Sequence, residues 1–90
     1  MNILEKANEI INKRSEEKER MYGPIGKSME RAAAIFNAMS STTQLTPQDM
    51  FLALVSIKLS RESNTHKEDN LLDAVAYLGA MNNYINEKNK

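Results

Sequence analysis

The chain has 90 residues, of which 41% are hydrophobic, with two Phe, three Tyr and no Trp. Twelve basic and twelve acidic side chains give a formal net charge of zero, which argues against a protein that coats nucleic acid or lies on anionic lipid. The absence of cysteine excludes disulfides, thiolate zinc sites and thiol catalysis. No apolar run is long enough to span a bilayer, so we expect no membrane partner and a cytoplasmic location.

The size of the chain predicts one domain, residues 1–90, and an adaptable core. A chain this short buries only about 60–65% of its unfolded surface. With so few aromatic residues, its core has to be built from Leu, Ile, Ala and six Met. We therefore expect extra stability to come from self-association into a homo-oligomer.

Apolar residues at helical spacing predict a first helix over about residues 2–20 and a second over about 27–40. Arg14 and Lys18 continue the apolar face of the first helix. Either their stems lie along the edge of the core, or their charges stand at the rim of a pocket for an anion. Tyr22-Gly23-Pro24 ends this helix, because glycine tolerates left-handed angles and proline disfavours helix in the residue before it.

A third helix is predicted over about 47–61 and a fourth over about 68–86. Thr46 can cap the third helix, Pro47 suits its first position, and Asp49 lies favourably in its first turn. Because it is apolar over most of its circumference, we expect it to be the most buried helix. Its remaining narrow strip is small enough to pack against another chain or helix: Asp49, Ala53, Ser56 and Ser60.

The fourth helix has two unlike faces. We expect the face that carries leucine and valine to be buried: Leu71, Leu72, Val75 and Leu78. The other face carries two acids followed by small and aromatic residues, a composition that suggests a pocket wall or a subunit contact: Asp69, Asp73, Ala76, Tyr77, Ala80 and Tyr84.

The turn between the last two helices gathers the only concentrated charge chemistry. Lys58 and Arg61 close the third helix on its apolar side, and Asp69 and Asp73 open the fourth on one face. A short turn makes the two helices antiparallel neighbours, which brings both pairs to the same end of the hairpin. A cation on an apolar surface needs a partner, since an unpaired buried charge is costly.

Three interpretations of this hinge compete. In the first, Lys58 or Arg61 pairs with Asp69 or Asp73 and locks the hairpin without any ligand. In the second, the two aspartates bind magnesium and the cations bind phosphate. In the third, cations bind a nucleotide-type anion without metal while a tyrosine stacks on its base, with the candidate residues Arg14, Lys18, Tyr22, Lys58, Arg61, Tyr77 and Tyr84.

The order of these motifs resembles a small phage-encoded, all-helical family of unassigned activity. The resemblance is carried by Tyr22-Gly23, by Lys58-Leu59-Ser60-Arg61 and by the DxxxDxxxY spacing of Asp69, Asp73 and Tyr77. It covers about three quarters of the chain and implies a bacteriophage origin, hence the host cytoplasm.

The DxxxDxxxY helix is also similar, more weakly, to the last core helix of MazG-like nucleoside triphosphate pyrophosphohydrolases. That similarity implies an all-α oligomer with magnesium held by ExxE and ExxD pairs. Asn70 stands where ExxD would need its glutamate, and Lys58 and Arg61 occupy the helix where further acids would be wanted. These departures favour binding over hydrolysis.

The sequence thus predicts an all-α domain of about four helices, with the C-terminal antiparallel hairpin as its core, assembled into a homo-oligomer. The predicted function is binding of a nucleotide-type anion at the hinge, to sequester a host defence signal. Two alternatives stay open: a magnesium-dependent pyrophosphohydrolase, and an inhibitor that binds a host protein through the Ala76–Tyr84 face.

Overall fold

The computed structural model describes residues 1–12 and 24–89 of the chain. Four helices run through these residues: α1 (Ile3–Asn12), α3 (Ile25–Met39), α4 (Pro47–Asn64) and α5 (Glu68–Lys88). Within this described part there is no strand, which confirms the all-α class. None of the described helices is long and apolar enough to cross a membrane.

The start of α4 confirms the capping signal in the sequence. The Thr46 hydroxyl accepts a 3.2 Å hydrogen bond from the Asp49 backbone N–H, and the Asp49 carboxylate accepts a 2.8 Å bond from the Thr46 N–H. This reciprocal pair satisfies two backbone donors that a helix start would otherwise leave free. The hydrogen bonds from Thr46 also lower the pKa of Asp49.

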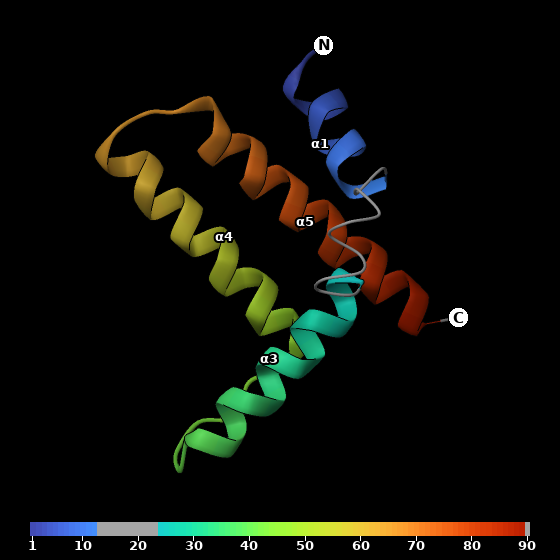
Figure 1. The fold of residues 1–90 in the computed structure, drawn as a ribbon, viewed down its shortest axis with the longest axis vertical. Coiled ribbons are helices and arrows are strands. Elements are labelled where there is room, and N and C mark those ends of the chain that lie inside the picture. Colours follow the sequence, from blue (N-terminus) through green and yellow to red (C-terminus); the bar gives the residue numbers. More distant parts are fainter. Residues whose placement is uncertain (13–23, 90) are drawn as a thin grey trace.

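The C-terminal helices form the predicted antiparallel hairpin. Figure 1 shows α4 and α5 side by side, joined by a short turn, with α1 against the opposite side of α5. Helix α3 packs across the open end of this hairpin, near the start of α4 and the end of α5. Helix α5 is therefore the central element, and α4 lies at an edge of the molecule.

The buried face of α5 differs from the prediction. The face that carries leucine and valine was expected to be buried, yet Leu78 on it is 43% exposed. The buried residues of α5 are instead Asn70, Ala74, Ala76 and Ala80. Because α5 lies between two helices, small side chains let both of them approach closely, and the larger ones occupy the margins. The Ala76–Ala80 face, for which the sequence suggested a pocket wall or a subunit contact, is packed within this chain.

Helix α4 is also less buried than predicted. Only Phe51 and Val55 are buried on it, whereas Leu52, Ile57 and Leu59 are nearly half exposed. The reason is positional, since both α5 and α3 contact α4 and no other described helix covers its outer side. Phe51 is fully buried and packs against the Tyr84 ring, with 5.9 Å between ring centroids.

Candidate functional site

The hinge between α4 and α5 is fixed by Glu62. One carboxylate oxygen of Glu62 accepts hydrogen bonds from the Lys67 backbone N–H at 3.0 Å and from the Asn70 side-chain amide at 3.4 Å. Its other oxygen contacts His66 Nδ1. These bonds, the one with His66 first, lower the pKa of Glu62. Sequence reasoning missed this residue, although its i, i+4 spacing to the single histidine was a visible signal.

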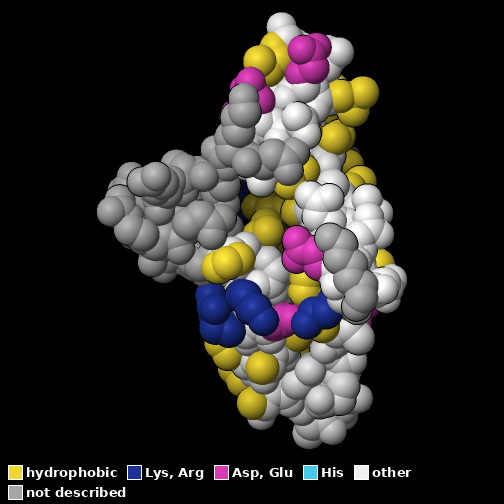
Figure 2. Space-filling model, turned by 90° about the vertical axis from the view of Figure 1, so that its right-hand side faces the viewer, with side chains coloured by type: hydrophobic (Ala, Val, Ile, Leu, Met, Phe, Trp, Pro, Cys, Tyr) yellow, Lys and Arg dark blue, Asp and Glu magenta, His cyan; other side chains and the backbone are white. Residues whose placement is uncertain are grey.

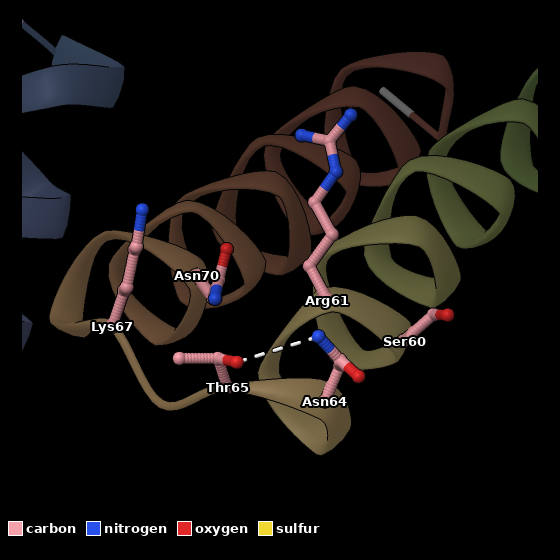
Figure 3. A pocket seen from close by; sticks show the side chains of 6 residues that line it. All are labelled: Ser60, Arg61, Asn64, Thr65, Lys67 and Asn70. Atoms are coloured by element: carbon pink, nitrogen blue, oxygen red, sulfur yellow. Dashed lines mark hydrogen bonds between the residues drawn. The ribbon is translucent and has the colours of Figure 1, made fainter.

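Beside this turn lies an open hollow of about 660 Å³, a volume typical of small-molecule sites. Figure 3 shows Arg61 and Lys67 pointing to the same side of the hairpin, one from the last turns of α4 and one from the residue before α5, with Asn70 between them. The full lining is Ser60, Arg61, Asn64, Thr65, Lys67 and Asn70.

The two cations of the hollow differ from the other charges nearby. Within the described residues, neither the Arg61 guanidinium nor the Lys67 ammonium takes part in an ion pair. Arg61 is exposed, so its charge costs little to leave unpaired. The remaining lining groups are hydroxyls and amides, which can donate hydrogen bonds to phosphate oxygens. The hollow can therefore accept an anion without breaking an ion pair between described residues.

Lys58 does not share this arrangement with Arg61. Its Nζ lies 3.0 Å from Asp73 Oδ2, joining α4 to α5, and the two side chains are 19% and 36% exposed. This is one of the pairings expected if the hinge were locked by charge. Asp73 thus already has a cation beside it.

Asp69 is exposed in the first turn of α5, next to Glu68. Lys6 of α1 forms a 2.9 Å ion pair with Glu68 at the start of α5. The hydrogen bond and charge of Glu68 raise the pKa of Lys6, and the charge of Asp69 raises it further. Asp73 thus forms an ion pair with a cation of α4, whereas Asp69 is in none of the ion pairs among the described residues.

The other predicted site residues fall into two groups. Arg14, Lys18 and Tyr22 lie outside the described residues. Tyr77 is half-buried on α5 and does not line the hinge hollow. In the ranges 1–12 and 24–89, no group of three or more acidic or histidine side chains is placed to hold a metal ion.

A second charged cluster, which sequence reasoning missed, lies at the opposite end of α5. Glu30 accepts a 2.9 Å hydrogen bond from the Tyr84 hydroxyl and pairs with Lys88 at 3.0 Å and Lys27 at 3.3 Å. The bonds from Lys88 and Tyr84 lower the pKa of Glu30 to about 2. Basic and acidic side chains gather across one face of the molecule in Figure 2. Glu30, Lys27 and Lys88, with Tyr84 and the buried Ala80, line a hollow of about 610 Å³.

Comparison with known proteins supplies a family and a phage relative. Residues 2–85 match the model of a family described as "Domain of unknown function (DUF6378)". The "Gene 55 protein" of Mycobacterium phage L5 is 30% identical over 83 residues, which cover 90% of this chain and 51% of that protein. The chain thus spans about half the length of this curated relative. No solved structure matches.

Proposed function

We propose, from the premise that the chain belongs to the DUF6378 family of unassigned activity, that it is a phage protein whose hinge hollow binds the phosphate groups of a nucleotide-type ligand. One observation carries this proposal. Arg61 and Lys67, without ion-pair partners among the described residues, flank an open hollow otherwise lined by hydroxyl and amide groups.

The two cations suit different parts of a phosphate-bearing ligand. The Arg61 guanidinium can donate two parallel hydrogen bonds to one phosphate, while the Lys67 ammonium acts as a compact charge for a neighbouring phosphate. The Asn70 amide donates to Glu62 and the Asn64 amide donates to the Thr65 hydroxyl, and each amide has a second N–H and a carbonyl oxygen that suit the edge of a base. The volume of the hollow, about 660 Å³, falls within the roughly 300–1,000 Å³ that is typical of small-molecule binding sites.

Binding without hydrolysis is the favoured form of this function. Lys58 Nζ lies 3.0 Å from Asp73, and so occupies a position from which it would repel a magnesium ion at that carboxylate. In the host cytoplasm, a protein that holds a nucleotide signal without turning it over would keep that signal from its receptor. Sequestration of a host defence nucleotide is therefore the role that we propose.

Calorimetric titration with nucleoside triphosphates and with cyclic nucleotides, each with and without magnesium, tests the proposal. We expect the wild-type chain to bind one of these nucleotides without magnesium. The Arg61→Gln variant should bind the same nucleotide at least about tenfold more weakly, because a charge-assisted hydrogen bond contributes about 1.5–3 kcal/mol. Arg31→Gln is the matched control, since Arg31 is an exposed arginine on α3, outside the hollow.

Two outcomes would contradict the proposal in different ways. Equal affinity of Arg61→Gln and the wild type would show that the hollow is not the binding site. Magnesium-dependent release of a nucleoside monophosphate, lost in Asp69→Asn, would instead establish a pyrophosphohydrolase.

A further inference from the structure

Asn70 is the buried polar residue of the hinge hollow. It is 9% exposed, and among the described residues no other polar or charged residue is buried. Its backbone N–H donates a 3.0 Å hydrogen bond to the Lys67 carbonyl, which fixes its place near the start of α5. A buried amide needs partners for its polar atoms, because an unmade hydrogen bond is costly there. The partners of Asn70 therefore show how its amide is oriented.

Glu62 of α4 sets this orientation. Its Oε1 accepts a 3.4 Å hydrogen bond from Asn70 Nδ2 and a 3.0 Å bond from the Lys67 backbone N–H, while its Oε2 contacts His66 Nδ1. These contacts, the one with His66 first, lower the pKa of Glu62, so the carboxylate is ionised near neutral pH. An ionised carboxylate only accepts hydrogen bonds. Turning the Asn70 amide over would set two acceptor oxygens against each other, so its nitrogen stays on the side of Glu62.

The Asn70 oxygen consequently opens on the hollow. Figure 3 shows this oxygen on the side of the amide toward which Arg61 and Lys67 extend, with the nitrogen on the opposite side. The oxygen accepts no hydrogen bond from the described residues, among which no fully buried side-chain oxygen or nitrogen lacks a partner. It is therefore accessible from the hollow and can accept a hydrogen bond from a ligand.

The groups that Asn70 has left to offer match a base rather than a phosphate. An ionised phosphate oxygen has no hydrogen to donate to the Asn70 oxygen, whereas the Arg61 and Lys67 side chains donate to phosphate. Adenine and cytosine have an amino donor next to a ring nitrogen that accepts, and an asparagine amide pairs with such an edge through its oxygen and an N–H. Guanine and uracil have a carbonyl oxygen in place of that amino group, and it would face the Asn70 oxygen.

We infer, as an extension that rests on the proposed nucleotide binding, that the hinge hollow selects nucleotides whose base carries an amino group beside an unprotonated ring nitrogen. The phosphates lie on Arg61 and Lys67, and Asn70 reads the base. Glu62 does not line the hollow, and it is the positioning residue that holds the Asn70 oxygen outward.

Calorimetric titration of the wild-type chain with matched pairs of nucleotides tests this selectivity. The first pair is ATP and purine riboside triphosphate, which lacks only the amino group. The second is CTP and UTP, in which a carbonyl oxygen replaces the amino group. We expect the amino member of at least one pair to bind about tenfold more tightly, and the responding pair distinguishes adenine from cytosine. Equal affinities within both pairs, or tighter binding of GTP or UTP than of ATP and CTP, would overturn the inference.

Two substitutions of Glu62 test its positioning role through the ratio of affinities within the responding pair. Glu62→Gln keeps an oxygen that can accept both hydrogen bonds, so it should preserve the ratio. Glu62→Met removes the acceptor and should bring the ratio close to one, because the Asn70 amide can then turn over. A merely structural role would weaken both nucleotides equally and leave the ratio unchanged, which would overturn the assignment. Asn82→Ala, at an exposed position of α5 outside the hollow, is the control and should keep the wild-type ratio.

Arg61→Gln separates a failure of this inference from a failure of the proposed function. Weaker binding of every nucleotide by Arg61→Gln, together with equal affinities within both pairs, would leave the hollow as a phosphate site and overturn only the selectivity. A wild-type chain that binds none of these nucleotides would overturn both.

Discussion

The Tyr84 hydroxyl donates a 2.9 Å hydrogen bond to Glu30, and this contact ties the end of α5 to the start of α3 across 54 positions of sequence. The Tyr84 ring also packs on the buried Phe51 of α4. Burial of the ring, followed by the Glu30 carboxylate, raises the pKa of the Tyr84 hydroxyl. One side chain thus joins three helices, and Glu30 holds it in place.

Acid should weaken this junction through Glu30. The pKa of Glu30 is about 2 in the folded chain, against an ordinary value of 4.5, so its stabilising effect is complete above pH 4.5 and is lost as the pH falls toward 2. Glu30→Gln, which cannot ionise, should melt at a lower temperature than the wild type at pH 7. We expect the difference in Tm between the two proteins to narrow between pH 4.5 and pH 2. A difference that stays constant over that range would contradict this account.

Two glycines should respond oppositely to alanine. A Cβ at Gly26 would lie 2.7 Å from the Tyr84 ring, which is held by Glu30 and Phe51, so Gly26→Ala should destabilise the fold by about 1–3 kcal/mol. A Cβ at Gly79 would meet only the terminal methyl of Ile11, at 2.6 Å, and that methyl can rotate away. Gly79→Ala should therefore be neutral, or stabilising by up to about 1 kcal/mol from helix propensity. Urea unfolding of both variants is the measurement, and equal losses would contradict the assignment of the Tyr84 junction as rigid.

The Lys58–Asp73 pair should contribute modestly to the hairpin. Both side chains are partly exposed, so a double-mutant cycle with Lys58→Met and Asp73→Asn should give a coupling energy of about 0.5–1 kcal/mol in chemical unfolding. Raising the salt concentration should reduce it. A coupling energy indistinguishable from zero would show that the pair does not lock the hinge.

Removal of the α4 cap should lower the free energy of unfolding more than a comparable substitution in the loop before α4. Thr46→Ala leaves the Asp49 backbone N–H without its side-chain acceptor, and should lower the free energy of unfolding by about 1 kcal/mol. Thr43→Ala, at an exposed position of the loop before α4, is the control and should change it by less than about 0.5 kcal/mol. Equal effects of the two substitutions in thermal melts would contradict the role of the cap.

The sequence by itself determined the local features of this protein. Helical spacing of apolar residues and the Thr46–Asp49 capping signal depend on neighbours along the chain, and these predictions of the all-α class, the C-terminal hairpin and the start of α4 are confirmed. The phage-family resemblance, carried by short motifs in order, is confirmed in the same way.

Only the tertiary structure decided which faces are covered and which charges meet. Helix α5 buries its alanines because two helices approach it at once, a fact that no single helix pattern contains. The same placement leaves the outer leucines of α4 exposed, pairs Lys58 with Asp73, and sets Arg61 and Lys67 on the same side of the hairpin at the hollow. Contacts between side chains distant in sequence, such as Glu30 with Tyr84, follow from how the helices pack, and periodicity along one helix cannot specify that packing.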